Sequence, residues 1–162
     1  MADKLSMYIA MYSEMLGNKY FLARNYQGAA QNLQFVLSKN PINKSARKKI
    51  IICYTQTGEI EKAFDNFYTL VKEDIHFIID TDPVADDCPC PDLVAKYGKV
   101  YRYEKKSYDL KLMLGMLWLY CDVYKSWEIF DELNSNNDHD FKLKEVLSLI
   151  EQNKKSINKN TN

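Results

Sequence analysis

Glycine and proline are scarce in this sequence of 162 residues, where they number five and four. Both residues interrupt helices, so their scarcity favours long helical segments and an all-α fold. An excess of charge is also missing, because 22 Lys and Arg balance 22 Asp and Glu. A chain without net charge shows no sign of nucleic acid or of an anionic membrane surface as its partner.

Long hydrophobic runs are missing as well. The longest run, 112–121, has ten residues, whereas a membrane-spanning helix needs about 20. The sequence therefore predicts no membrane span. The first residues show no basic stretch followed by an apolar one, so we expect no signal peptide and a cytoplasmic location.

The run 112–121 is apolar on every side of a helix. A helix of this kind is either central in the core or half-exposed at an association surface. The sequence leaves both interpretations open. In the second, the protein forms a homodimer through 112–121.

What the chain does contain is apolar surface, with 46% hydrophobic and 13% aromatic residues. That composition supports a folded core, and the length suits one domain. We expect this domain to cover 1–154. The polar end of the chain, 155–162, is predicted to be a disordered tail.

The first half of the chain repeats itself with a period of 34 residues, the separation of position 16 from position 50. Within each copy, apolar residues at i, i+4 and i+7 predict two helices with one apolar stripe each. Residues at 24–25 and 57–59 sit where a tight turn joins the two helices, and Gly58 suits a left-handed helix end. The matched pairs are Leu16 and Ile50, Tyr20 and Tyr54, Tyr26 and Ile60, Ala29 and Ala63, Leu33 and Phe67, and Val36 and Leu70.

This pattern resembles the tetratricopeptide repeat family. The first copy has the large, small and aromatic residues of the family's first helix, followed by those of its second helix and a closing proline: Leu16, Gly17, Tyr20, Ala29, Leu33, Val36 and Pro41. The second copy keeps Tyr54, Gly58, Ala63 and Phe67, whereas Ile51 replaces a small residue and Ile75 the proline. A generic antiparallel helical bundle is the alternative.

The resemblance implies a right-handed superhelix of helix-turn-helix repeats that ends in a capping helix. We expect the repeats at about 10–43 and 44–77, followed by an irregular loop at 80–91. A degenerate third helical pair is expected at about 105–135, with Leu114 and Gly115 matching Leu16 and Gly17. The cap is expected at 140–152, with Asp140 as its N-cap.

In the family, the first helices of the repeats line a concave groove that receives a peptide or a partner helix. By register, the groove residues here are Glu14, Asn18, Phe21, Lys48, Ile52, Thr55 and Gln56. The carboxylate clamp that some members use to bind chaperone C-termini is broken, because Glu14 stands at its basic position and Ile52 follows Lys48 four residues later. The resemblance implies an adaptor or scaffold that binds another protein.

Four cysteines in a chain without export signals favour reduced thiols. Cys88 and Cys90 alternate with prolines, and two thiolates in this spacing could bind a soft metal such as zinc or copper(I). A proline-stiffened loop with incidental thiols is the simpler interpretation. A redox pair is a third, although a disulfide within Cys-x-Cys is strained. Cys53 and Cys121 lie on apolar helix faces, where buried structural cysteines are usual.

No motif of a known catalytic centre occurs in the sequence. We therefore expect a binding protein without a cofactor and without enzymatic activity. The alternatives are a cytoplasmic chaperone of a hydrophobic client, similar to secretion chaperones, and a metal-binding module that uses Cys88 and Cys90.

Overall fold

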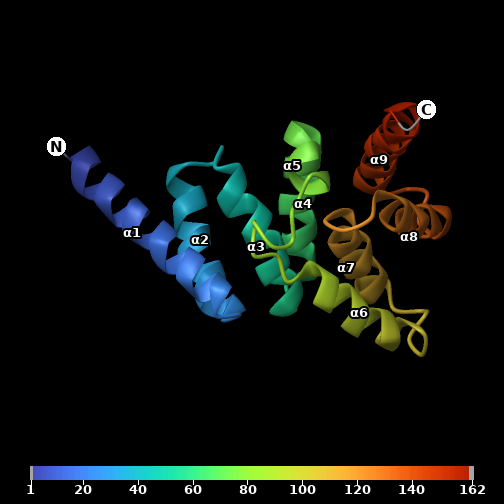
Figure 1. The fold of residues 1–162 in the computed structure, drawn as a ribbon, viewed down its shortest axis with the longest axis horizontal. Coiled ribbons are helices and arrows are strands. Elements are labelled where there is room, and N and C mark those ends of the chain that lie inside the picture. Colours follow the sequence, from blue (N-terminus) through green and yellow to red (C-terminus); the bar gives the residue numbers. More distant parts are fainter. Residues whose placement is uncertain (1, 161–162) are drawn as a thin grey trace. The chain divides into compact units, whose positions relative to one another are not determined.

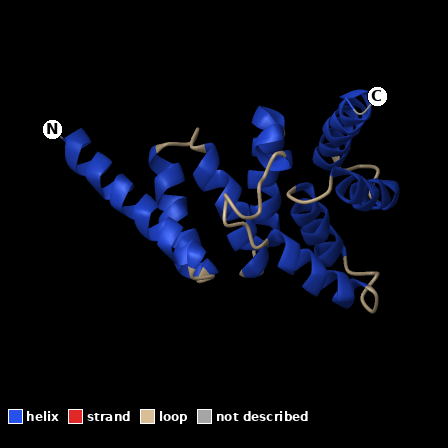
Figure 2. Ribbon diagram, in the orientation of Figure 1, coloured by secondary structure: helices blue, strands red, loops and turns tan. Residues whose placement is uncertain are grey.

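The structure, a computed structural model, describes residues 2–160, and every regular element in that range is a helix (Figures 1 and 2). The predicted all-α fold is confirmed. In chain order the helices are α1 (Ala2–Leu22), α2 (Tyr26–Lys39), α3 (Lys44–Gln56), α4 (Ile60–Asp74), α5 (His76–Ile79), α6 (Cys90–Tyr101), α7 (Tyr108–Leu119), α8 (Val123–Asn136) and α9 (Phe141–Asn160).

The chain divides into two compact units, which differs from the single domain predicted from its length. Unit 1 is Met1–Phe67 and unit 2 is Tyr68–Asn162. The boundary falls within α4, so the first half of that helix belongs to unit 1 and its last turns to unit 2.

Unit 1 begins with a helical hairpin in which α1 packs on α2. The turn is stabilised by Arg24, whose φ of 60° reverses the chain, and by Asn25, whose side chain accepts a hydrogen bond of 3.0 Å from the Gly28 N–H. An Asn cap satisfies one of the free N–H groups of a helix start. The helix α2 ends at Lys39, two residues before Pro41, as the sequence predicts.

The second hairpin of unit 1 starts at α3, which packs on α2 and also contacts α1. Asn43 caps α3 by accepting a hydrogen bond of 2.9 Å from the Ala46 N–H. Gly58 has a φ of 80°, the left-handed conformation predicted for it. Arg47 of α3 donates a hydrogen bond of 2.6 Å to the side chain of Asn66 on α4.

Glycine permits the close approach of α1 and α2. A Cβ atom at Gly17 would lie 2.9 Å from both Cγ and Cδ2 of Leu33, which is fully buried. At the matched position of the second copy, Ile51 is also fully buried. The close packing of the first hairpin therefore depends on the absence of a side chain at Gly17.

Unit 2 joins the end of α4 to the last helix of the chain. The Tyr68 hydroxyl donates a hydrogen bond to Glu145 of α9, and Lys72 forms a salt bridge of 3.2 Å with the same carboxylate. The irregular segment ends at Pro89, two residues earlier than predicted. Pro91 lies within the first turn of α6, where its missing N–H leaves no hydrogen bond unmade.

The hairpin of α7 and α8 has the predicted place of a degenerate third pair. A Cβ at Gly115 would lie 3.0 Å from Phe130, and the Ser126 hydroxyl donates a hydrogen bond of 2.7 Å to the Gly115 carbonyl. Both Phe130 and Ser126 are fully buried. Gly115 and Phe130 thus repeat the contact of Gly17 with Leu33, with one residue less between them.

The apolar run is core. Residues 112–117, 119 and 120 are all buried, so of the two interpretations the central position is the one that the structure shows. A homodimer through 112–121 is not supported, because only Trp118 and Cys121 of this run are even partly exposed.

The helix α9 has the predicted cap, since Asp140 accepts a hydrogen bond of 3.1 Å from the Leu143 N–H. Leu143, Val146 and Ile150 are fully buried and form its inner face. The helix continues to Asn160, so the prediction of disorder is wrong for 155–160. The last two residues of the predicted tail, 161–162, lie outside the described part of the chain. The right-handed superhelix stays a prediction.

Candidate functional site

The groove residues predicted by register do not form one open surface. Phe21, Ile52 and Thr55 are at most 4% exposed. The Thr55 hydroxyl donates a hydrogen bond of 2.6 Å to the Ile52 carbonyl and accepts one of 3.1 Å from the Gln56 side chain. These three residues have no surface for a partner in this structure, contrary to their predicted role.

The other predicted groove residues are partly exposed. Glu14 accepts a hydrogen bond of 3.0 Å from the side chain of Asn43, and Asn18 accepts one of 2.8 Å from Lys49. Both bonds link α1 to the start of α3, so Glu14 and Asn18 stabilise the pairing of these helices. Lys48 is half-buried on α3, and Gln56 lies at the end of that helix.

A hollow within unit 1 lies beside the turns of the two hairpins and has a volume of about 730 Å³. We call it the polar hollow, because most of its lining side chains carry amide, hydroxyl or charged groups. One wall comes from the first turn and α2, and the other from the end of α3 and the start of α4. Its lining residues are Arg24, Asn25, Tyr26, Gln27, Ala30, Gln31, Gln34, Tyr54, Gln56, Thr57, Glu59 and Lys62.

Three glutamines form a row along the α2 wall. Gln27, Gln31 and Gln34 follow one another at i, i+4 and i+7, opposite the buried stripe of Ala29 and Leu33. All three side chains are exposed. Each glutamine carries one amide acceptor and two donors, and within the described chain these amides make no hydrogen bond.

The opposite wall is more constrained. Lys62 donates a hydrogen bond of 2.6 Å to Glu59 and lies 5.7 Å from the ring centroid of Tyr54. Burial raises the pKa of Tyr54, with Lys62 lowering it to a smaller extent. The hydrogen bond to Glu59 raises the pKa of Lys62. This wall therefore presents a neutral phenol and a paired cation.

A smaller cleft of about 350 Å³ lies at the other end of unit 1, beside the first half of α1. Met7, Ala10 and Met11 give it an apolar side, while Lys39 and Glu14 bring opposite charges. Of the predicted groove residues, Glu14 lines this cleft and Gln56 lines the polar hollow. The sequence analysis missed the glutamine row, although its i, i+4, i+7 spacing was a signal for a common face.

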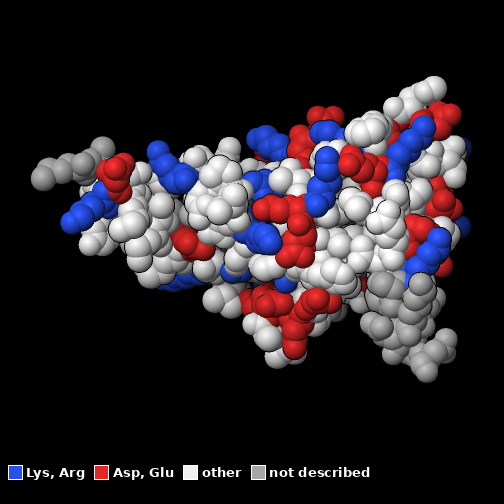
Figure 3. Space-filling model, turned by 90° about the horizontal axis from the view of Figure 1, so that it is seen from above, with Lys and Arg blue, Asp and Glu red and all other residues white. Residues whose placement is uncertain are grey.

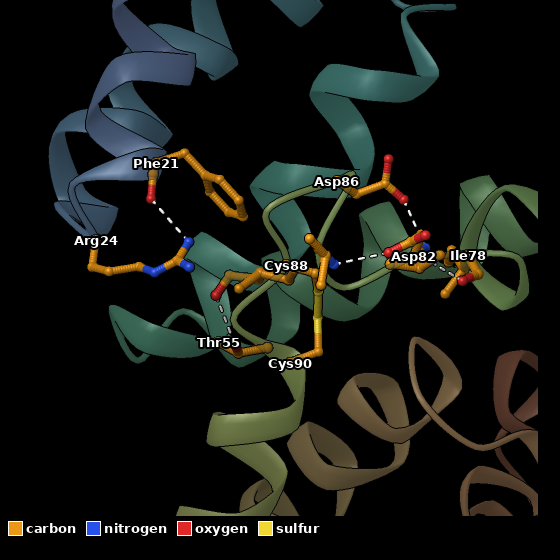
Figure 4. Close-up of a disulfide and its surroundings, with 11 residues drawn as sticks. Phe21, Arg24, Thr55, Ile78, Asp82, Asp86, Cys88 and Cys90 are labelled. Carbon is orange, nitrogen blue, oxygen red and sulfur yellow. Dashed lines mark hydrogen bonds between the residues drawn. A yellow bond between two sulfur atoms is a disulfide. The ribbon is translucent and has the colours of Figure 1, made fainter.

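The irregular segment 80–89, which we call the cysteine loop because it carries Cys88, is ordered by its own acidic side chains (Figure 4). The Asp82 carboxylate accepts hydrogen bonds of 2.9 and 3.1 Å from the N–H groups of Val84 and Ala85, and its own N–H donates one of 2.9 Å to Asp86. Such Asx turns hold a tight reversal without regular secondary structure.

Cys88 and Cys90 form a disulfide at the start of α6 (Figure 4). The prediction of reduced thiols is wrong for this pair, and a disulfide leaves no thiolate for zinc or copper(I). Among the residues that the structure describes, no three His, Cys, Asp or Glu side chains converge as metal ligands. Cys53 is a buried free thiol as predicted, whereas Cys121 is free but exposed.

On the face drawn in Figure 3, acidic and basic side chains are interspersed. In the described chain, no helix combines the length and apolar character that crossing a membrane requires.

No protein-family model matches this chain, and neither a curated protein nor a solved structure is significantly similar to it. The function therefore has to be argued from the surfaces of the molecule itself.

Proposed function

We propose that this chain is a protein-interaction module, an adaptor or scaffold without catalytic activity, and that unit 1 binds an extended segment of a partner protein in the polar hollow. The observation that carries the proposal is the row of Gln27, Gln31 and Gln34. These exposed amides line a hollow of about 730 Å³ and have no hydrogen-bond partner within the described chain.

The spacing of Gln27 and Gln31 approaches that of an extended backbone, whereas Gln31 and Gln34 lie closer together. Helical residues four and three apart lie about 6 and 4.5 Å apart along the axis, at a rise of about 1.5 Å per residue. In an extended peptide, the groups that point to one side recur about every 6.6 Å. Glutamine amides donate and accept, so the row can pair with alternate peptide groups of a segment lying along α2.

Recognition of this kind reads the partner's backbone more than its side chains. The Tyr54 ring supplies an apolar contact on the opposite wall, with the Lys62 ammonium group 5.7 Å from its centroid. We therefore expect a partner segment that is extended and polar, with tolerance for sequence change at side chains that point out of the hollow.

The test uses a displayed library of random dodecapeptides selected on the intact protein. Selected peptides are then measured against a variant with Gln27→Ala, Gln31→Ala and Gln34→Ala. A net hydrogen bond contributes about 0.5–1.5 kcal/mol, so losing three of them should weaken binding by about 10-fold to 1,000-fold.

The matched control is Gln152→Ala, an exposed glutamine on α9 outside the polar hollow, which should leave affinity unchanged. N-methylation of alternate peptide groups should weaken binding more than alanine substitution of the same peptide residues. A library that yields no binder, or binders that the triple variant holds equally well, would contradict the proposal.

A further inference from the structure

The helix α1 exposes an apolar face that nothing in the described chain covers. Its inner side, with Gly17 and Phe21 buried, packs on α2. Its outer side carries large apolar side chains that are 46–67% exposed: Leu5, Tyr8, Ile9, Tyr12, Met15 and Leu22, with Met11 beside them. A helix with two apolar faces requires a second neighbour.

The outer face has the spacing of a coiled-coil seam. Leu5, Tyr8, Tyr12, Met15 and Leu22 are separated by three, four, three and seven residues, and Lys19 stands at the position that divides the last interval into four and three. Alternation of three and four is the heptad pattern in which two helices interlock along one stripe. We call these six positions the α1 seam.

We propose that a second copy of this chain covers the α1 seam, so that the protein forms an antiparallel homodimer through α1. In the antiparallel register, Leu5 of one copy lies opposite Leu22 of the other, Tyr8 opposite Lys19, and Tyr12 opposite Met15. Every position of the seam then has a compatible neighbour on the second copy.

The charge on the seam decides the orientation. A parallel pair would place the two Lys19 ammonium groups opposite each other inside the interface, where like charges repel. The antiparallel pair places each Lys19 beside a Tyr8 ring, and a cation over an aromatic ring is an attractive contact. The seam is thus self-complementary in one orientation only.

The exposed area corresponds to a small interface at the lower limit for specific pairs. The seam and the flanking Ile9 and Met11 expose on the order of 500 Å² of apolar side-chain surface per copy, taking about 100 Å² for an aliphatic and 200 Å² for an aromatic side chain. Two copies bury about 1,000 Å² of apolar surface together, which reaches the total that a specific interface needs. The polar hollow of unit 1 has no part in this pairing.

The first measurement is the mass of the intact protein by light scattering at about 50 μM, where a chain of 19.0 kDa should run at twice that mass. The variant Tyr12→Glu places a carboxylate against Met15 of the second copy in both central layers, and it should be monomeric at the same concentration. Because Tyr12 is 58% exposed, the variant should keep the helical circular dichroism of the parent. The control Val84→Glu, at a position 90% exposed in the cysteine loop, should stay dimeric.

The double variant Tyr12→Glu with Met15→Lys tests the orientation. In the antiparallel pair, each introduced carboxylate faces an introduced ammonium group, and the dimer should return. A parallel pair would place like charges opposite each other and would gain nothing. Three results would overturn the proposal: a monomeric parent, a dimer that survives Tyr12→Glu, or a double variant that stays monomeric. If the monomeric parent captures an apolar peptide through Tyr12, the face belongs to a hydrophobic client instead.

Discussion

The helices α1 and α7 are both rich in large apolar residues, but these residues are buried in α7 and largely exposed on the outer face of α1. In α7, residues 112–117 and 119 are buried. In α1, Leu5, Tyr8 and Tyr12 are all more than half exposed. Composition alone would rank α7 as the association surface, yet its neighbours α6 and α8 cover it. An apolar helix marks an interface only when the fold leaves one of its faces without a neighbour.

The strongest test of this comparison removes the same side chain from each helix. Leu117 of α7 is fully buried, whereas Leu5 of α1 is 67% exposed. Leu117→Ala should lower the free energy of unfolding by about 2–5 kcal/mol, because it leaves a cavity. Leu5→Ala should change it by at most about 0.5 kcal/mol.

Urea unfolding of both variants, at protein concentrations below about 1 μM, measures the difference without a contribution from self-association. Equal losses would show that α1 and α7 are not distinguished by burial.

A second test compares two glycines. Gly17 of α1 faces Leu33 at 2.9 Å from the position of a Cβ, whereas a Cβ at Gly98 of α6 would meet nothing within 4 Å. Gly17→Ala should destabilise the protein by about 1–2 kcal/mol, because the added methyl group forces the hairpin apart.

Gly98→Ala should stabilise it by about 0.5–1 kcal/mol, because alanine loses less backbone entropy in a helix. Thermal unfolding followed by circular dichroism gives both signs. A stabilising Gly17→Ala would mean that the contact of α1 with α2 is looser than described.

The smallest expected effect concerns the free cysteines, one in each unit. Burial raises the pKa of the Cys53 thiol from its ordinary 9.0 to about 12. Below pH 9 the folded and unfolded states both hold this proton, so the contribution of Cys53 to stability is fully present there. Between pH 9 and 12 the unfolded state alone loses the proton, so stability falls as pH rises, by up to about 1.4 kcal/mol per pH unit.

Urea unfolding between pH 8.5 and 10.5 should therefore show a steeper loss for the parent than for Cys53→Ala. In the folded protein at pH 8, iodoacetamide should modify Cys121 faster than Cys53, because Cys121 is exposed and its pKa, which burial and Asp122 raise to about 11, stays below that of Cys53. An equal slope in parent and variant, or rapid alkylation of Cys53, would place this thiol outside the core.

Much of the local structure was predictable because it depends on neighbours in the sequence. The helix α2 ends at Lys39 because Pro41 follows its C-cap Asn40 directly. Gly58 turns the chain because glycine, unlike other residues, adopts a φ of 80° without strain. The cap at Asp140 belongs to the same class. The tail was mispredicted because polar composition does not distinguish an exposed helix from disorder, and α9 continues to Asn160.

The candidate sites were less predictable. Register placed Phe21, Ile52 and Thr55 in an open groove, but the structure buries all three. The exposure of a helical face depends on every segment that packs there. The glutamine row of α2 was visible as a pattern, yet its importance depends on the hollow that α3 and α4 complete.

The sequence by itself determined that the chain is helical, where several helices begin or end, and that 34 residues separate two similar hairpins, as Tyr20 and Tyr54 show. These properties depend on backbone sterics, on capping side chains and on periodicity, all of which act over a few residues. Only the tertiary structure decided which apolar face is covered, because burial depends on segments far apart in the chain. It buries the apolar residues 112–117 of α7 and leaves Leu5, Tyr8 and Tyr12 of α1 exposed.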